Sequence, residues 1–496
     1  MLAKFYTLVV LLFTALYTVH AQEMPVSECG THAYSPWLKW YHDHKNEFAS
    51  RSVDTNWLFV PTTVHITCPD NSVNFYADEE VFRIICDMNK QYEPAHIHFY
   101  LVPGESFVYH SNSSWWQHDW AGGQEMIETT LIPDRLNCYI VDDPVGNCGY
   151  SWLGAIVLNT DCSGVGNTTW AHEAGHHFSL PHTFYGWENQ TWNYATPAPP
   201  EWDGYEVERM DGSNCLFSGD GFCDTKPDYL NARWTCNDQS QSTQIQQDPI
   251  GVPFVSDGTL FMSYSSVTCR NRFSDEQIEA MRANLYTEHS NYLQASESGE
   301  PIADSAVVTY ISPIDSAIQQ YNNVVLNWLP IENATFYQVE VALSPSFSVL
   351  FYKKHVYGTT VNIQSNIPNN RTLYWRVRPY SEWDLCKIPG TIPKQVFKTR
   401  NNTAVNELER TTDITIAPNP TTSGTPIMMT ITHPEQVNMQ LTMNDASGQI
   451  IYKKYKELQS GENQVEIPTQ QLAAGFYLVT VQTANGILTK SVVITQ

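Results

Sequence analysis

The hydrophobic and polar positions of this chain change their spacing several times along its length. Four runs rich in apolar and β-branched residues have the length of buried strands: 57–68, 97–102, 137–141 and 155–159. After the first run, apolar residues recur at helical spacing at Val81, Ile84, Ile85 and Met88. Asp78 precedes them and is predicted to cap this helix. These elements predict an α/β domain in the N-terminal part of the chain.

After about residue 297 the pattern changes to the alternation that is typical of β-strands. The polar segment 296–305, SESGEPIADS, has the composition of a linker. Alternating runs follow it: VVLNW, FYQVEVAL and LYWRVRPYS. We expect Trp328, Tyr337 and Trp375 in the core of a sandwich similar to fibronectin type III domains. No motif here carries chemistry, so we expect a spacer or a substrate-docking module.

The run from His172 to His182, HEAGHHFSLPH, combines three imidazoles with one carboxylate. On a helix, His172 and His176 lie on one face, about 6 Å apart along the axis, so both rings can reach one ion. His182 is the natural third ligand, and Glu173 is free to act on water. A surface helix with two histidines is the alternative, but the spacing of His182 requires the chain to leave the helix and return.

The spacing H-E-x-x-H-x-x-x-x-x-H resembles the elongated motif of the metzincin metallopeptidases. Metzincins usually have Gly three residues after the second His, where the backbone is left-handed, and Ser179 stands there instead. Residues 259–273, TLFMSYSSVTCRNRF, resemble the Met-turn of the pappalysin-like (cytophagalysin) metzincins. The resemblance implies that Met262 lies below the metal and that Tyr264 hydrogen-bonds the developing oxyanion. Ordinary core packing is the alternative role for Met262.

A helix is predicted directly after the Met-turn. Ser274 and Gln277 have the spacing of a capping box. The segment 215–228, CLFSGDGFCDTKPD, is similar to the GD-x-x-x-DTP segment of the same family, with Lys226 where Pro is usual. In relatives this region binds structural calcium, which makes Asp220 and Asp224 candidate Ca²⁺ ligands, with solvated acidic side chains as the alternative.

Eleven cysteines in an exported chain predict disulfides, and the odd total leaves at least one thiol unpaired. The family resemblance implies a disulfide between Cys236 and Cys269, and Cys215 with Cys223 is a second candidate pair. Cys29 lies earlier, in ECGTH, and Cys29-Gly30-Thr31 resembles the pro-segment motif that keeps some relatives latent. A structural disulfide is the alternative for Cys29.

The N-terminus has the features of a secretory signal peptide over residues 1–21. Lys4 precedes the apolar run 8–16, and Val-His-Ala at 19–21 forms a small-residue cleavage site. No later apolar stretch reaches the roughly 18 residues that span a bilayer, so we expect no transmembrane segment after cleavage. The net charge of −25, from 52 acidic and 27 basic residues, argues against nucleic-acid binding.

The C-terminal residues carry a further family pattern. Three segments resemble the C-terminal sorting domain of the type IX secretion system: APNPTTSG at 417–424, NDASGQIIY from 444, and LAAGFYLVTVQTANGILTKSVVI. The resemblance implies a Bacteroidetes-type bacterium, the type IX secretion machinery as a partner, and a product that is secreted or attached at the cell surface. A binding module is the alternative.

Together these expectations divide the chain into a signal peptide 1–21, a pro-segment 22–52, a metzincin catalytic domain 53–297, a fibronectin type III-like sandwich 298–400, a linker 401–410 and a sorting domain 411–496. We expect a secreted zinc endopeptidase with one catalytic Zn²⁺ that cleaves protein or peptide substrates, with Glu173 as general base toward a zinc-bound water. Structural Ca²⁺ is a second candidate cofactor. A non-catalytic adhesin or binding protein on a metzincin scaffold is the alternative, favoured by Ser179 alone.

Overall fold

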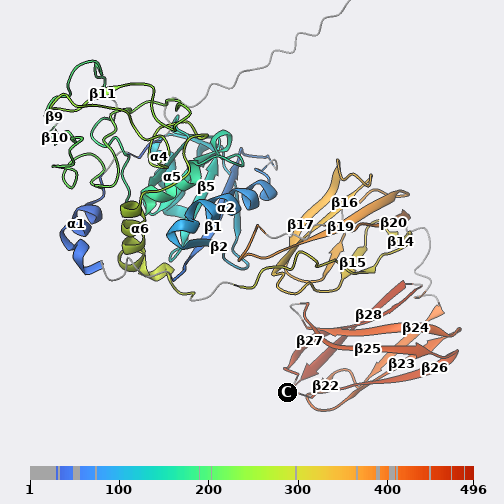
Figure 1. Cartoon of the computed structure of the whole chain (residues 1–496). Helices are drawn as coiled ribbons and strands as arrows, with labels where there is room; N and C mark the ends of the chain where they lie inside the picture. Colours follow the sequence, from blue (N-terminus) through green and yellow to red (C-terminus); the bar gives the residue numbers. More distant parts are fainter. Residues whose placement is uncertain are drawn as a thin grey trace, which may run out of the picture.

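The computed structural model describes residues 29–31, 34–48, 56–72, 75–188, 190–202, 204–295, 299–364, 367–386, 391–400, 408, 411–445, 448–470, 472–484 and 486–495. The predicted signal peptide and nearly all of the predicted linker 401–410 lie outside these residues. Three parts are named below by their residues: the α/β region (56–295), the middle sandwich (308–400) and the C-terminal sandwich (411–495). Figure 1 shows them in sequence order from blue to red.

The α/β region is built on a six-stranded sheet. Its strands are β1 (Leu58–Cys68), β2 (Ile97–Leu101), β3 (Phe107–Ser111), β5 (Leu136–Val141), β7 (Gly149–Trp152) and β8 (Ala155–Asn159). They follow the order β2, β1, β5, β8, β7, and β3 also pairs with β1. Only the β7–β8 pair is antiparallel. Every residue of β1 is buried, as expected for a parallel strand covered on both faces. The four predicted strands are therefore confirmed.

Helix α1 (Pro36–Phe48) packs against α6 (Asp275–Thr287). The other helices of this part are α2 (Asp78–Tyr92), α3 (Ser113–Trp116), α4 (Trp120–Thr130) and α5 (Thr169–His177). Short elements join them: η1 (Glu93–Ala95), β4 (Gln117–His118), β6 (Asp143–Pro144), η2 (Thr160–Cys162) and η3 (Ser290–Tyr292). The predicted apolar face of α2 is buried in the same core as β1 and β2. Ser274 and Gln277 form the predicted capping box at the start of α6.

The segment between α5 and α6 has little regular structure. It contains four two-residue strands: β9 (Glu201–Trp202), β10 (Tyr205–Glu206), β11 (Gln246–Gln247) and β12 (Pro253–Phe254). Its own aromatic core includes Phe184, Trp187 and Tyr229. Disulfides join Cys215 to Cys223 and Cys236 to Cys269, the two pairs considered from the sequence. Disulfides thus stabilise this loop-rich segment between α5 and α6, in which few hydrogen bonds join strands.

The two C-terminal parts are sandwiches of eight strands each. The middle sandwich contains β13 (Tyr310–Ser312), β14 (Ala317–Gln320), β15 (Val324–Trp328), β16 (Phe336–Ala342), β17 (Leu350–Val356), β18 (Thr360–Ile363), β19 (Thr372–Tyr380) and β20 (Gln395–Arg400). The C-terminal sandwich contains β21 (Asp413–Ala417), β22 (Thr421–Thr422), β23 (Ile427–His433), β24 (Val437–Asn444), β25 (Ile450–Leu458), β26 (Gly461–Ile467), β27 (Gly475–Thr483) and β28 (Gly486–Thr495). Trp328, Tyr337 and Trp375 are buried in the middle core, as predicted.

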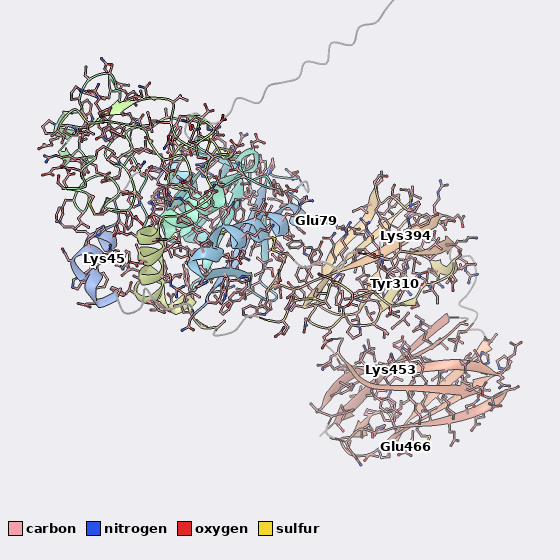
Figure 2. All side chains as sticks on the ribbon, in the orientation of Figure 1. Lys45, Glu79, Tyr310, Lys394, Lys453 and Glu466 are labelled. Carbon is pink, nitrogen blue, oxygen red and sulfur yellow. A yellow bond between two sulfur atoms is a disulfide. The ribbon has the colours of Figure 1, made fainter. Side chains whose placement is uncertain are left out.

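The middle sandwich is joined to the α/β region far from the chain connection. A disulfide links Cys86 of α2 to Cys386, which follows β19. The Phe82 ring on α2 lies 5.7 Å from Phe336 and 4.6 Å from Tyr380 of the sandwich. Glu79 accepts a hydrogen bond from a sandwich glutamine, and Figure 2 places it at this border. The polar segment 296–305 predicted a linker, yet Phe336 and Tyr380 of the sandwich belong to the hydrophobic core of the α/β region.

This contact also corrects the predicted cap of α2. Asp78 is the first residue of the helix, and Ala77 occupies the N-cap position without a side-chain hydrogen bond. The Asp78 carboxylate lies 3.3 Å from His355 Nε2 on β17. The predicted cap was wrong because the Asp78 carboxylate contacts the middle sandwich. This contact between distant parts of the chain has no signal in the sequence around Asp78.

Candidate metal centre

Three histidine side chains converge at the end of α5. His172 and His176 lie one turn apart on this helix, and their Nε2 atoms are 3.1 Å apart. His182 follows the helix and brings its Nε2 to 3.1 Å from that of His176. His172 and His182 are each only 1% exposed. The predicted metal ligands are therefore neighbours in a buried site.

The other ring nitrogen of each histidine has an acceptor. These are the Phe261 carbonyl for His172 at 2.7 Å, the Leu180 carbonyl for His176 at 2.7 Å, and the Glu188 carboxylate for His182 at 3.3 Å. An acceptor beside Nδ1 favours the tautomer that carries its proton on Nδ1. Each Nε2 then keeps its lone pair, and the three lone pairs face one another. Burial, with the neighbouring imidazoles, lowers the pKa of His172 well below its ordinary value. Three neutral imidazoles in this arrangement fit Zn²⁺.

Ser179 is the residue that lets His182 return to α5. It has a φ of 74°, the left-handed conformation that the motif requires and that usually selects Gly. Its hydroxyl lies 3.0 Å from Ser35 Oγ and 3.0 Å from Asn284 Nδ2. The Leu180 N–H bonds back to the Gly175 carbonyl at 2.9 Å. These hydrogen bonds offset a strain on the order of 1 kcal/mol at a non-Gly residue.

Cys29 lies at the open side of the three histidines. Its Sγ and the three imidazoles offer ligand atoms that all lie within 4.8 Å of one another. The thiol also donates to Glu173 Oε2 at 3.4 Å, and the Thr31 N–H donates to Sγ at 3.2 Å. Glu173 itself is fully buried. Burial first, and the Glu173 carboxylate second, raise the pKa of the Cys29 thiol well above its ordinary value.

The backbone around Cys29 runs beside β7, the end strand of the six-stranded sheet. The Gly30 N–H donates to the Gly149 carbonyl at 2.8 Å, and the Ser151 N–H donates to Thr31 Oγ1 at 2.7 Å. Because an edge strand leaves backbone groups without a ladder partner, it can accept another extended segment. Residues 29–31 occupy part of this edge.

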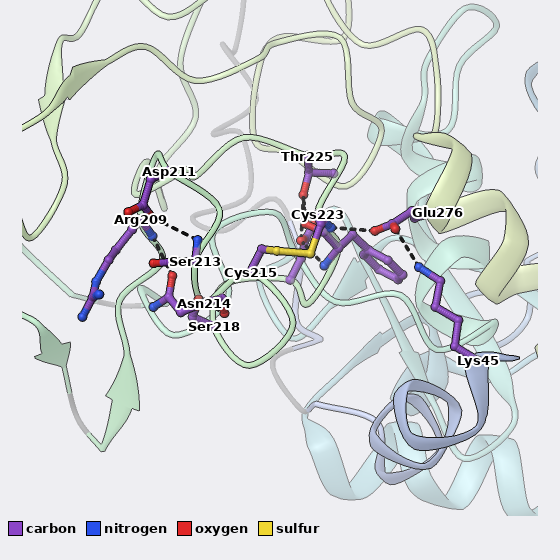
Figure 3. Close-up of a disulfide and its surroundings, with 12 residues drawn as sticks. Lys45, Arg209, Asp211, Ser213, Asn214, Cys215, Ser218, Cys223, Thr225 and Glu276 are labelled. Carbon is purple, nitrogen blue, oxygen red and sulfur yellow. Dashed lines mark hydrogen bonds and ion pairs between the residues drawn. A yellow bond between two sulfur atoms is a disulfide. The ribbon is translucent and has the colours of Figure 1, made fainter.

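Helix α1 anchors the segment that carries Cys29. Trp37 Nε1 donates to Thr287 Oγ1 at 2.9 Å on α6, and Lys45 forms a 2.6 Å ion pair with Glu276. Glu276 also accepts the Cys223 N–H at 2.6 Å, beside the Cys215–Cys223 disulfide (Figure 3). The contacts of α1 thus join it to α6 and, through Glu276, to the disulfide loop.

Met262 packs against α5, and Tyr264 lies beside His182. Met262 is fully buried, and a Cβ added at Gly175 would meet its sulfur at 2.5 Å, so this side chain packs closely against α5. The Tyr264 ring centre lies 4.9 Å from that of His182. Its hydroxyl donates to the Cys29 carbonyl at 3.1 Å.

The two candidate calcium ligands accept hydrogen bonds from protein donors. Asp220 is fully buried and accepts hydrogen bonds from the Phe222 N–H at 3.0 Å and Thr225 Oγ1 at 2.9 Å. Burial raises its pKa. Asp224 accepts the Glu276 N–H at 2.8 Å. Among the described residues, a group of converging metal ligands occurs only at Cys29 and the three histidines, so the calcium site stays a prediction.

Sequence reasoning missed Glu188, which lies six residues after His182. Its Oε2 accepts the Gly186 N–H at 2.8 Å, while Oε1 faces the His182 ring. The short distance along the chain could have indicated this contact. A glutamate in a loop is usually solvated, however, so spacing alone gives no reason to select it.

Comparison with known proteins identifies one part of the chain. Residues 415–495 match the secretion system C-terminal sorting domain, which confirms the sorting domain predicted from the sequence. No curated protein matches the chain. The match indicates export, followed by secretion or attachment at the cell surface. No helix among the described residues is long and apolar enough to cross a membrane.

Three solved structures are similar to parts of the chain. A promirolysin mutant from Tannerella forsythia is 17% identical with a TM-score of 0.36, covering 54% of this chain and 97% of its own. The FN1-FN3 domains of chicken CNTN1 are 11% identical with a TM-score of 0.18, covering 40% and 70%. Dimeric latent PorU from Porphyromonas gingivalis is 11% identical with a TM-score of 0.16, covering 38% and 20%. These scores do not establish a shared fold.

Proposed function

We propose that this chain is a secreted zinc endopeptidase of the pappalysin-like metzincin type, made as a latent precursor. The proposal rests on one observation above all. Three imidazole Nε2 atoms, the Glu173 carboxylate and the Cys29 thiol meet at one point. A structural histidine cluster does not need a carboxylate and a thiol on its open side.

The chain's own residues have separate roles in this proposal. His172, His176 and His182 would hold the ion, which when bound supplies a Lewis acid that polarises a carbonyl and makes water more acidic. Glu173 takes the proton from the attacking water and passes it to the leaving amine. The Tyr264 hydroxyl donates a hydrogen bond to the oxyanion.

Substrate orientation follows from the edge of β7. In the precursor the Gly30 N–H and the Thr31 hydroxyl bond to this strand, and an extended substrate would use the same Gly149 carbonyl and Ser151 N–H groups. The scissile bond would then lie at the histidines, where Cys29 now lies. The precursor is latent because its own chain fills the position of the substrate.

The alternative, a binding protein without turnover, depended on Ser179. This residue has the backbone conformation that the motif requires, so it no longer favours that alternative. The calcium ligands Asp220 and Asp224 stay predictions, and the proposed reaction does not use them.

Cleavage of a denatured protein substrate tests the proposal. We expect the Cys29→Ala chain to cleave it, and we expect a chelator to stop cleavage. Glu173→Ala in the same background should lower the rate at least about 100-fold while the zinc content stays at one per chain. Glu201→Gln, at an exposed glutamate of β9, is the matched carboxylate control. Zinc binding without cleavage by the Cys29→Ala chain would establish the binding protein instead.

A further inference from the structure

The three histidines differ in how their rings are held. The rings of His172 and His176 extend from one helix and face main-chain carbonyl oxygens at Nδ1, each at 2.7 Å. His182 lies outside α5, so no helix orients its side chain. Its Nδ1 faces the carboxylate of Glu188 at 3.3 Å instead of a main-chain carbonyl.

The loop that carries Glu188 is built to hold this contact. The Tyr185 N–H donates to the His182 carbonyl at 3.1 Å, and Gly186 adopts a φ of 90°, which favours glycine. The second Glu188 oxygen accepts the Gly186 N–H at 2.8 Å. The chain therefore turns back, and both carboxylate oxygens have donors.

Aromatic packing fixes the same loop from both ends. The Phe184 ring stacks on His182 with a centroid distance of 4.6 Å. Trp187 stacks on Tyr229 at 4.6 Å. The Glu188 side chain is 12% exposed, so water screens its charge little. A carboxylate held this close to an imidazole orients the ring and raises the basicity of its other nitrogen.

We propose that Glu188 is a positioning residue for zinc, which holds His182 with its Nε2 toward the other two histidines and places a negative charge behind that ligand. The inference rests on the proposed zinc endopeptidase. It predicts that the carboxylate contributes to metal affinity beyond what a neutral acceptor gives. Glu188→Gln separates these effects, because the amide keeps an acceptor oxygen and loses the charge.

Zinc affinity provides the test. The full-length precursor with Cys29→Ala serves as background, so that the thiol does not compete for the ion. Competition with a chromophoric chelator should show zinc binding about 10-fold weaker in Glu188→Gln and up to about 100-fold weaker in Glu188→Ala. Glu201→Gln, an exposed glutamate in the same loop-rich half, should leave the affinity unchanged.

A second measurement separates positioning from folding. The unfolding temperature of Glu188→Gln in excess chelator should equal that of the background, whereas a merely structural residue would lower it. Equal zinc affinity in all Glu188 variants overturns this inference and leaves the proposed function standing. A background that binds no zinc overturns both.

Discussion

The middle and C-terminal sandwiches have the same topology and different surroundings. In each, the first, third and sixth strands form one sheet, and the other five follow the order second, eighth, seventh, fourth, fifth. The second and eighth strands pair in parallel in both. Nevertheless, the middle sandwich, besides its own core, contributes residues to the core of the α/β region and is linked to that region by a disulfide, while the core of the C-terminal sandwich is separate.

The outer face of the five-stranded sheet explains this difference. In the middle sandwich Gln338 and Glu340 on this face are buried, at 0% and 2% exposure, and Gln338 donates a hydrogen bond to Glu79 of α2. In the C-terminal sandwich Phe476 and Leu478 on β27 are exposed, at 70% and 50%. Two sandwiches with the same strand order therefore differ in their surroundings. The middle sandwich is fixed to the α/β region, and the C-terminal sandwich is a separate unit that matches the sorting domain.

Removal of the middle sandwich should affect folding far more than removal of the C-terminal sandwich. A chain that ends at residue 297 loses the partners of Phe82 and Cys86, so we expect it to be insoluble or unfolded. A chain that ends at residue 410 keeps the shared core, so its main unfolding transition should be unchanged. Calorimetry of both proteins checks this. A folded, soluble 1–297 chain would show that the middle sandwich is only a spacer.

A matched pair of phenylalanines should give the next largest effect. Phe336→Ala removes a ring that is 1% exposed at the shared core and should cost about 3–5 kcal/mol of unfolding free energy. Phe476→Ala removes an exposed ring and should change stability by less than about 0.5 kcal/mol. Urea unfolding of both variants measures the difference. Similar losses would mean that the two faces are equally covered in solution.

Acid should weaken the α/β region through His65 on β1. Burial lowers the pKa of His65 to about 4 from its ordinary 6.5, so the folded state resists protonation. The contribution of the neutral His65 ring to the free energy of unfolding is complete above pH 6.5. This contribution is lost as the pH falls toward 4, by about 3 kcal/mol in total. Urea unfolding between pH 7 and 4 measures this slope, which His65→Gln should reduce. An unchanged slope in that variant would assign the acid sensitivity to other groups.

Local patterns predicted much of the fold. The spacing of apolar and polar residues is a local signal, because it depends only on residues that are close in the sequence. This signal predicted the strands around β1, the capping box of Ser274 and the core tryptophans of the middle sandwich. The topology shared by the two sandwiches could not be predicted, because strand pairing depends on contacts between distant residues. The Cys86–Cys386 disulfide spans 300 residues and has no local signal.

The candidate site shows the same division. The three histidines are predictable because helical spacing and one tight turn bring them together. Glu188 is not, since only the fold of its loop turns the carboxylate toward His182. Likewise, Ser179 departs from the motif, and the hydroxyl contacts with Ser35 and Asn284 that hold its turn come from other elements.

Zinc K-edge X-ray absorption of the purified precursor would show whether Cys29 and the three histidines hold one ion, because it counts the nitrogen and sulfur ligands of a bound zinc. We expect one zinc with three nitrogen ligands and one sulfur ligand, and loss of the sulfur signal in Cys29→Ala. A precursor that binds no zinc, or whose zinc has the same ligands with and without Cys29, would contradict this expectation.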